Sequence, residues 1–131
     1  MNLFSVGIPV FKGKFLKECL YSIINQSYNN FEIIIVNDAS PDNIDVIIEE
    51  FNDKRIKYYK NEKNTGAENV VDNWNKCLSL STGDYFLIMG DDDKMDPLYL
   101  EEFLRLINEF PQLNVYHCRS TVIDEYSVPI R

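Results

Sequence analysis

Two hydrophobic patterns take turns along the chain. Short, nearly continuous apolar runs are typical of strands covered on both faces of a parallel sheet, whereas apolar residues that recur every three or four positions are typical of helices with one buried face. The apolar runs predict strands over residues 3–10, 31–36, 55–60, 85–89 and 114–122. The helical spacing predicts helices over residues 15–24, 44–51, 67–80 and 97–110.

Strands and helices therefore alternate, without an internal repeat or a linker. Such alternation predicts parallel strands joined by right-handed crossovers, with helices on both faces of the sheet. The predicted fold class is α/β, a Rossmann-like three-layer α/β/α arrangement with a mainly parallel central sheet, formed by one domain over residues 1–131. We expect the run 85–89 to be a central strand, the run 55–60 to lie near the sheet edge, and Trp74 to belong to the core.

Carboxylates follow two of the predicted strands at the point where each strand ends. Asp91, Asp92 and Asp93 come after the fourth strand, and Asp38 comes after the second. In open α/β sheets ligands bind at the carboxyl ends of the strands, and adjacent carboxylates repel one another unless a cation lies between them. Mg²⁺ and Mn²⁺ commonly take one or two carboxylates, with water and phosphate oxygens completing the shell. The sequence therefore predicts a divalent-cation site at this edge, with a solvated acidic turn as the alternative.

No glycine-rich phosphate loop accompanies the acidic edge. A Gly-x-Gly-x-x-Gly motif does not follow the first strand, and the chain contains no Walker sequence. The phosphates of a nucleotide would therefore need another partner, and a metal on the aspartates supplies one. The polar stretch 61–66 belongs to the same edge, where it either closes over a bound molecule or serves as a plain connector.

Composition narrows the classes of partner. The chain has 21 acidic and 13 basic residues, for a formal net charge of −8, which disfavours nonspecific binding to nucleic acid or to an anionic membrane. Cys19, Cys77 and Cys118 are far apart and odd in number, so we expect reduced thiols in a cytoplasmic protein. His117 is interpreted as a core or surface residue and not as a catalyst. No apolar run reaches the roughly 18 residues of a membrane span, and the N-terminal residues lack a signal peptide.

Four motifs occur in a fixed order along the chain. They are VGIPVF at 6–11, FEIIIVNDAS at 31–40, NWN at 73–75 leading into GDY at 83–85, and GDDD at 90–93 with Pro97 beyond it. Each motif alone is weak, but the ordered set covers nearly the whole chain. In this order the chain resembles family 2 of the glycosyltransferases, whose members have the GT-A fold.

The resemblance implies roles for individual residues. Pro9, Val10 and Phe11 would line the nucleotide base, and Asp38 would hydrogen-bond the base or the ribose. Asp91 would face the ribose, and Asp92 would bind the metal. Many members have an aspartate where this chain has Gly90, so the resemblance leaves either Asp92 or Asp93 as the residue that faces the metal.

The resemblance also implies an activity, a cofactor and partners. It implies metal-dependent, inverting transfer of a sugar from a nucleotide diphosphate sugar, most commonly a UDP-sugar, to a hydroxyl of a glycan or lipid-linked acceptor. The cofactor would be Mn²⁺ or Mg²⁺, and the setting would be bacterial-type cell-surface polysaccharide synthesis, in the cytoplasm or at the inner face of the membrane in the full-length protein.

Family members continue into an acceptor-binding half that supplies the catalytic base. We therefore expect this chain to be the donor-binding half of a glycosyltransferase of the GT-A type, with the base beyond Arg131, because Asp124 and Glu125 lie too early for that role. Apolar surface left open by the missing half would favour a homodimer. Two alternatives stay open, namely a non-catalytic nucleotide-sugar-binding module and a sugar nucleotidyltransferase, for whose basic, glycine-rich loop residues 11–14 are a poor match.

Overall fold

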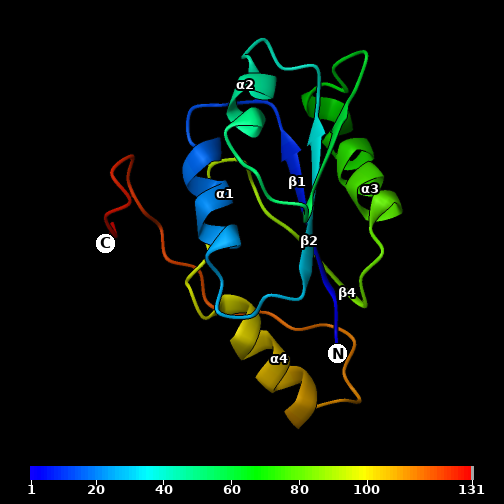
Figure 1. Cartoon of the computed structure of the whole chain (residues 1–131), viewed down its shortest axis with the longest axis vertical. Coiled ribbons are helices and arrows are strands. Elements are labelled where there is room, and N and C mark those ends of the chain that lie inside the picture. Colours follow the sequence, from blue (N-terminus) through cyan, green and yellow to red (C-terminus); the bar gives the residue numbers. More distant parts are fainter. Residues whose placement is uncertain (131) are drawn as a thin grey trace.

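Four parallel strands form the centre of the molecule (Figure 1). The structure, a computed structural model, describes residues 1–130. In the order in which they lie in the sheet, the strands are β3 (Ile56–Lys60), β2 (Phe31–Asn37), β1 (Phe4–Val10) and β4 (Tyr85–Ile88). All three neighbouring pairs are parallel, which confirms the predicted parallel sheet and the position of the third strand at its edge.

Helices cover both faces of this sheet (Figure 1). On one face lies α1 (Leu16–Ile24), with α2 (Ile44–Glu49) above it and α4 (Tyr99–Glu109) below it, and on the other face lie η1 (Ala67–Asn69) and α3 (Val70–Leu80). The side chains of β2 alternate between the two layers. Ile33 and Ile35 belong to the core beneath α1, whereas Ile34 and Val36 pack with Cys77 of α3. All seven residues of β2 are buried, as the continuous apolar run predicts.

The close approach of α3 to the sheet depends on a glycine in β1. A Cβ atom added at Gly7 would lie 2.9 Å from Cβ of Cys77 and 2.9 Å from the ring of Phe86. Only a residue without a side chain fits between these two neighbours. The glycine of the first sequence motif therefore sets the distance between β1 and α3.

Two expectations for the second half of the chain are wrong. The run 85–89 is not a central strand, because β4 pairs with β1 only and lies at the edge of the sheet among residues 1–130. The predicted strand 114–122 does not form. Its residues run as an irregular segment beside β4, with which they line a cavity of about 370 Å³, and the nearest strand-like pairing is a single bridge between Ile123 and Pro129. The apolar patterns of residues 85–89 and 114–122 are typical of strands with a neighbour on each side. Residues 1–130 do not provide these neighbours.

Trp74 is not a core residue either. The indole is 41% exposed, and the buried residues of α3 are Asn73 and Cys77. Asn73 turns inward because its amide group donates to the carbonyl oxygen of Val36, at 3.4 Å, and accepts from Asn61, at 2.8 Å. This polar anchor rotates the apolar stripe that contains Trp74 toward solvent. No helix in the described part of the chain is long and apolar enough to cross a membrane.

Candidate functional site

The carboxyl ends of β1, β2 and β4 bring the predicted site residues to one edge of the sheet. The register pairs Val10 with Asn37, so that Phe11 and Asp38 begin neighbouring loops, and the amide of Met89 donates to the carbonyl oxygen of Gly7 at 2.9 Å. The loop that follows Met89 therefore reaches the same edge. Asp38 and the acidic residues 91–93 thus lie around the end of β1, as the sequence predicts.

Asp91 ties the acidic loop to the turn that follows β1. Its Oδ2 atom accepts a hydrogen bond from the backbone amide of Phe11 at 2.9 Å and another from the amide of Lys12 at 2.8 Å. Two amide donors on one carboxylate oxygen offset part of its negative charge. The same contacts hold Phe11, whose side chain is 44% exposed, at the mouth of the site. A flat aromatic ring presented in this way can stack on a nucleotide base.

Asp92 and Asp93 converge on the space beside Gly90. A Cβ atom added at Gly90 would lie 2.8 Å from Oδ2 of Asp93 and 3.0 Å from Oδ1 of Asp92. The glycine therefore leaves room for the two carboxylates to approach one another, and a side chain at this position would displace both. Oδ2 of Asp93 also accepts a hydrogen bond from the amide of Gly90, at 3.1 Å.

These oxygens fit a hard divalent cation. Among residues 1–130 no cluster of three or more histidine, cysteine, aspartate or glutamate side chains is arranged to hold a metal ion. Two neighbouring carboxylates are nevertheless the usual protein contribution to a Mg²⁺ or Mn²⁺ site that takes its other ligands from phosphate and water. The acidic loop suits a cation that arrives together with a diphosphate, and it offers no complete cage for a cation alone.

A buried thiol lies beneath the acidic loop. Cys19 of α1 is fully buried, and its Sγ atom contacts the carbonyl oxygen of Gly90 at 3.5 Å. Burial, followed by the negative charges of Asp93, Asp91 and Asp92, raises the pKa of Cys19 to about 12. The thiol therefore stays protonated at neutral pH and supports the loop from below without reacting.

Asp38 holds the loop that precedes α3. Its Oδ1 atom accepts from the side-chain amide of Asn61 at 3.0 Å and from the backbone amide of Thr65 at 2.9 Å. Its Oδ2 atom accepts from the hydroxyl of Thr65 at 2.7 Å. A carboxylate has about four acceptor positions, so these three contacts leave about one for a ligand. Asp38 is 9% exposed, and it can therefore both fix the loop and meet a base or ribose donor.

Further amide groups complete this anchor. The side chain of Asn64 donates to the carbonyl oxygen of Asp38 at 2.7 Å. Lys76 of α3 donates to the side-chain oxygen of Asn61 at 2.6 Å, and Asn61 donates to Asn73, which is itself fixed to β2. The stretch 61–66 is thus tied to both β2 and α3. The sequence left two alternatives for this stretch, a segment that closes over a bound molecule and a plain connector, and it has no periodicity that could indicate these contacts.

The remaining predicted base-binding residues are placed differently from one another. Pro9 is partly exposed near the end of β1, and Phe11 projects beyond it. The side chain of Val10, by contrast, is fully buried in the core. Its carbonyl oxygen accepts from the amide of Asp38 at 2.8 Å. The role at the base that the resemblance assigns to Val10 stays a prediction, and with its side chain in the core this residue would meet a base through its backbone.

A groove that the sequence did not indicate opens beside the acidic loop. It encloses about 210 Å³ and is lined by Asp92, by residues at the start of α1 and by the turn over residues 123–127. Lys14 and Lys94 bring positive charge to it. Asp124 and Glu125, which the sequence placed too early in the chain for a catalytic base, also line this groove.

Known proteins share both the sequence pattern and the fold. A family model described as glycosyl transferase family 2 matches residues 5–128. Glycosyltransferase GlyG of Streptococcus pneumoniae is 34% identical over 111 residues, which cover 82% of this chain and 36% of that protein. The putative colanic acid biosynthesis glycosyl transferase WcaA of Escherichia coli is 32% identical over 135 residues, which cover 97% of this chain and 46% of that protein.

A solved structure shows the same arrangement of strands and helices. TarS of Staphylococcus aureus, in its 1–349 form, matches with a TM-score of 0.77 at 28% identity, over 85% of this chain and 33% of that one. The same protein in complex with UDP-GlcNAc matches with a TM-score of 0.74. This likeness confirms the Rossmann-like α/β fold of the GT-A type. The chain spans less than half the length of these relatives. Because the family model matches nearly the whole chain, from residue 5 to residue 128, the chain belongs to glycosyl transferase family 2.

Proposed function

We propose that the protein transfers a sugar from a nucleotide diphosphate sugar to an acceptor hydroxyl and that this chain binds the donor. The observation that carries the proposal is the convergence of Asp92 and Asp93 beside Gly90, next to a turn that Asp91 fixes through two backbone amides. In this arrangement the carboxylates of Asp92 and Asp93 would hold the metal that carries the diphosphate, and the fixed turn would hold the nucleoside beside it. TarS, whose fold this chain shares, is known in complex with UDP and with UDP-GlcNAc, which supports a UDP-sugar as the donor.

Each residue of the edge has a role in this proposal. Phe11 stacks on the base and Asp38 accepts a hydrogen bond from the base or ribose, while Asp91 holds the turn on which Phe11 lies. Asp92 and Asp93 would hold Mn²⁺ or Mg²⁺. When bound, such a cation neutralises the diphosphate and stabilises the charge that develops on the leaving group.

The acceptor and the chemical step lie outside this chain in the proposal. A carboxylate in the remainder of the protein would deprotonate the acceptor hydroxyl, which then attacks the anomeric carbon with inversion. The acceptor would be a glycan or a lipid-linked sugar in cell-surface polysaccharide synthesis, at the cytoplasmic side of the membrane. The relative WcaA is named as a putative colanic acid biosynthesis glycosyl transferase, which supports this setting.

A thermal-shift experiment tests the donor site. Mn²⁺ and UDP are added to the wild type singly and together, and the melting temperature is measured. Both ligands together should raise it most, because the cation needs phosphate oxygens and the diphosphate needs a cation to approach an acidic edge. At a ligand concentration of 100 times Kd the stabilisation is about 2.7 kcal/mol, which corresponds to roughly 10 °C for a chain of this length.

Two variants make the experiment specific. Asp92→Asn should abolish the joint effect of Mn²⁺ and UDP. Glu109→Gln removes one negative charge from the exposed last turn of α4, which lies at the other end of the molecule (Figure 1), and should leave the joint effect intact. A wild type that gains no stability from a metal together with any nucleoside diphosphate would refute the donor-site proposal.

A further inference from the structure

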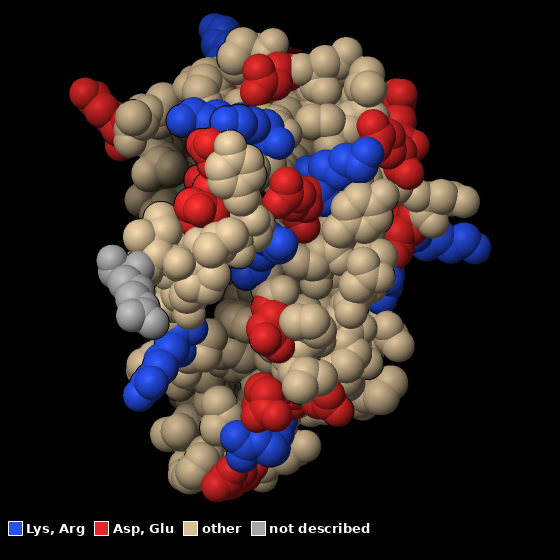
Figure 2. Space-filling model, turned by 90° about the vertical axis from the view of Figure 1, so that its left-hand side faces the viewer, with Lys and Arg blue, Asp and Glu red and all other residues tan. Residues whose placement is uncertain are grey.

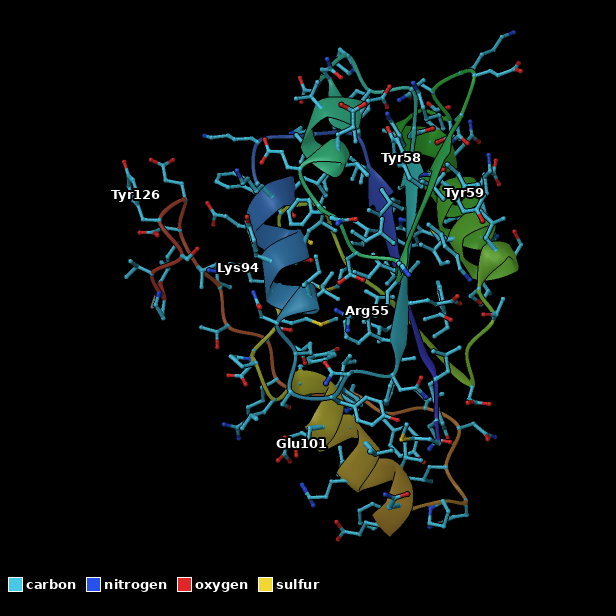
Figure 3. The ribbon with its side chains drawn as sticks, viewed as in Figure 1. Arg55, Tyr58, Tyr59, Lys94, Glu101 and Tyr126 are labelled. Carbon is cyan, nitrogen blue, oxygen red and sulfur yellow. The ribbon has the colours of Figure 1, made fainter. Side chains whose placement is uncertain are left out.

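The groove beside Asp92 has a wall that belongs to the C-terminal end of the chain. Residues 122–130 fold back on themselves in a short hairpin, in which the amide of Ile130 donates to the carbonyl oxygen of Val122 at 2.8 Å. Oδ1 of Asp124 accepts from the amides of Tyr126 and Val128, both at 2.9 Å, and so closes the turn. In Figure 3, Tyr126 lies at the outer end of this segment and points away from the sheet.

The hairpin is fastened to α1 by a chain of polar contacts. The ammonium group of Lys94 donates to the hydroxyl of Ser127 at 3.2 Å, and that hydroxyl donates to Glu18 of α1 at 3.3 Å. Figure 3 places Lys94 beside α1, between the helix and the C-terminal segment. The carboxylates of Asp124 and Glu18 are thus engaged in holding the wall, whereas no hydrogen bond from residues 1–130 reaches the carboxylate of Asp92.

Two ammonium groups of the groove are left without a carboxylate partner. Lys14 and Lys94 both line it, and neither forms an ion pair within 4.0 Å with any residue that the structure describes. Lys14 lies over the ring of Phe15, with its Nζ atom 5.0 Å from the ring centroid. Figure 2 shows the corresponding face, on which basic and acidic side chains are interleaved.

The size of the groove restricts what it can hold. Its volume of about 210 Å³ is below the roughly 300–1,000 Å³ of pockets that enclose a whole drug-sized ligand. It can therefore take only part of a nucleotide sugar. The part that suits the ammonium groups of Lys14 and Lys94 is a diphosphate. Four carboxylates line the same groove, namely those of Glu18, Asp92, Asp124 and Glu125, so a diphosphate would enter together with a cation on Asp92 that offsets part of their charge. Without these partners a diphosphate must approach a chain with a net charge of −8 and no glycine-rich phosphate loop.

We propose that Lys14 and Lys94 bind the diphosphate of the donor, in the groove that they share with Asp92. The inference rests on the proposed function and adds to it two residues and the hairpin that positions one of them. Asp92 would hold the cation, and the ammonium groups of both lysines would bind the diphosphate that this cation helps to neutralise. Ser127 acts as a positioning residue, because it reaches the ligand only through Lys94.

Calorimetry with four single variants tests this inference. Binding of UDP and of inorganic pyrophosphate is measured in the presence of Mn²⁺, and binding of uridine, which lacks phosphate, is followed by NMR titration. Lys14→Met and Lys94→Met should each weaken UDP and pyrophosphate about threefold to tenfold, the scale of a charge-assisted contact at a partly exposed site, and leave uridine unchanged. The double variant should also show a smaller dependence of UDP affinity on salt.

The other two variants are controls. Lys17→Met removes a lysine of α1 that pairs with Glu50, and it should bind UDP as the wild type does. Ser127→Ala releases the hairpin but keeps both ammonium groups, so UDP affinity should fall by less than about twofold. An equal loss in Ser127→Ala and Lys94→Met, with none in Lys14→Met, would show that the hairpin and not the charge matters, and would overturn the inference.

The failure of this inference differs from failure of the proposed function. If the wild type binds neither UDP nor uridine, the donor site itself is wrong, and the inference fails with it. If the wild type binds UDP but both lysine variants bind UDP and pyrophosphate equally well, the donor site stands, and the role of the two lysines is refuted.

Discussion

Replacing Glu32 by glutamine tests how the sheet is held together at the end opposite the site. Glu32 of β2 is 5% exposed and accepts four hydrogen bonds, from β1, from β3 and from the connection between α3 and β4. Its Oε1 atom accepts from the hydroxyl of Ser5 in β1 and from the amide of Thr82, both at 2.6 Å. Its Oε2 atom accepts from the hydroxyl of Thr82, at 2.9 Å, and from the ammonium group of Lys57 in β3.

The expected cost of Glu32→Gln follows from which contacts survive. The amide oxygen of glutamine can keep the contacts with Ser5 and with the backbone of Thr82, but its NH₂ group faces the ammonium of Lys57. Breaking a fully buried ion pair costs about 3–5 kcal/mol. The side chain of Lys57 is 41% exposed, so solvent recovers part of the loss. We expect a loss of about 2 kcal/mol, or roughly 7 °C in melting temperature for a chain of this length.

The pH dependence of stability provides the decisive assay. Burial by itself would raise the pKa of Glu32, but the hydrogen bonds from Lys57, Ser5 and Thr82 outweigh it and lower the pKa from 4.5 to about 2. The stability that Glu32 contributes is therefore fully present above about pH 4.5 and is lost as the pH falls toward 2. Urea unfolding of the wild type across this range should show the loss, and Glu32→Gln should lack that component.

Lys57→Met is the matched control. It keeps the carboxylate and its other three donors but removes the cation, so the folded-state pKa of Glu32 should rise toward its usual value. The acid-induced loss that Glu32 contributes should then be smaller and should be complete at a higher pH than in the wild type. A Glu32→Gln protein that unfolds within about 0.5 kcal/mol of the wild type, with the same slope below pH 4.5, would refute the argument.

Three further predictions concern the edge and the surface. Asp91→Ala frees the amides of Phe11 and Lys12, so it should cost about 1–3 kcal/mol of stability in urea unfolding and weaken UDP binding in calorimetry. Unchanged values would mean that other contacts hold the turn. Asp38→Asn should keep the fold and weaken UDP by about 1–3 kcal/mol, and unchanged affinity in calorimetry would remove Asp38 from the site. Exposed apolar surface along α3 and the open edge of β4 should lead to a homodimer, and sedimentation equilibrium that gives a monomer at every concentration would contradict this.

Hydrophobic periodicity predicted correctly those helices and strands that the described residues cover with other helices and strands. β2 is covered on both faces and α1 on one, so their patterns correspond to their surroundings in the structure. The patterns of β4 and of residues 114–122 indicate coverage that the described residues do not provide, and the prediction failed there. Trp74 was misplaced for a different reason, since a single buried amide, that of Asn73, decides which face of α3 turns inward.

The site was predictable only in part. Strand ends mark where the acidic residues gather, and a parallel sheet brings those ends together, so the common edge of Asp38 and Asp91 follows from the sequence. The partners of these carboxylates are backbone amides and side chains far away in the sequence, such as Phe11, which is 80 positions from Asp91. Lys94 and Ser127 are 33 positions apart, and no periodicity connects them. Contacts of this kind depend on the folded backbone and leave no local pattern.

The close contact at Gly7 connects the packing of the buried sheet with the shape of the proposed donor site. A methyl group at this position would press on Cys77 from 2.9 Å, and α3 would have to slide outward. Asn73 lies one turn before Cys77 on the same helix and holds Asn61, which in turn holds Asp38. A displacement of a few tenths of an ångström would thus pass from the core to Asp38 and the proposed donor site. Efforts to change donor preference should accordingly vary the edge and leave residue 7 as glycine.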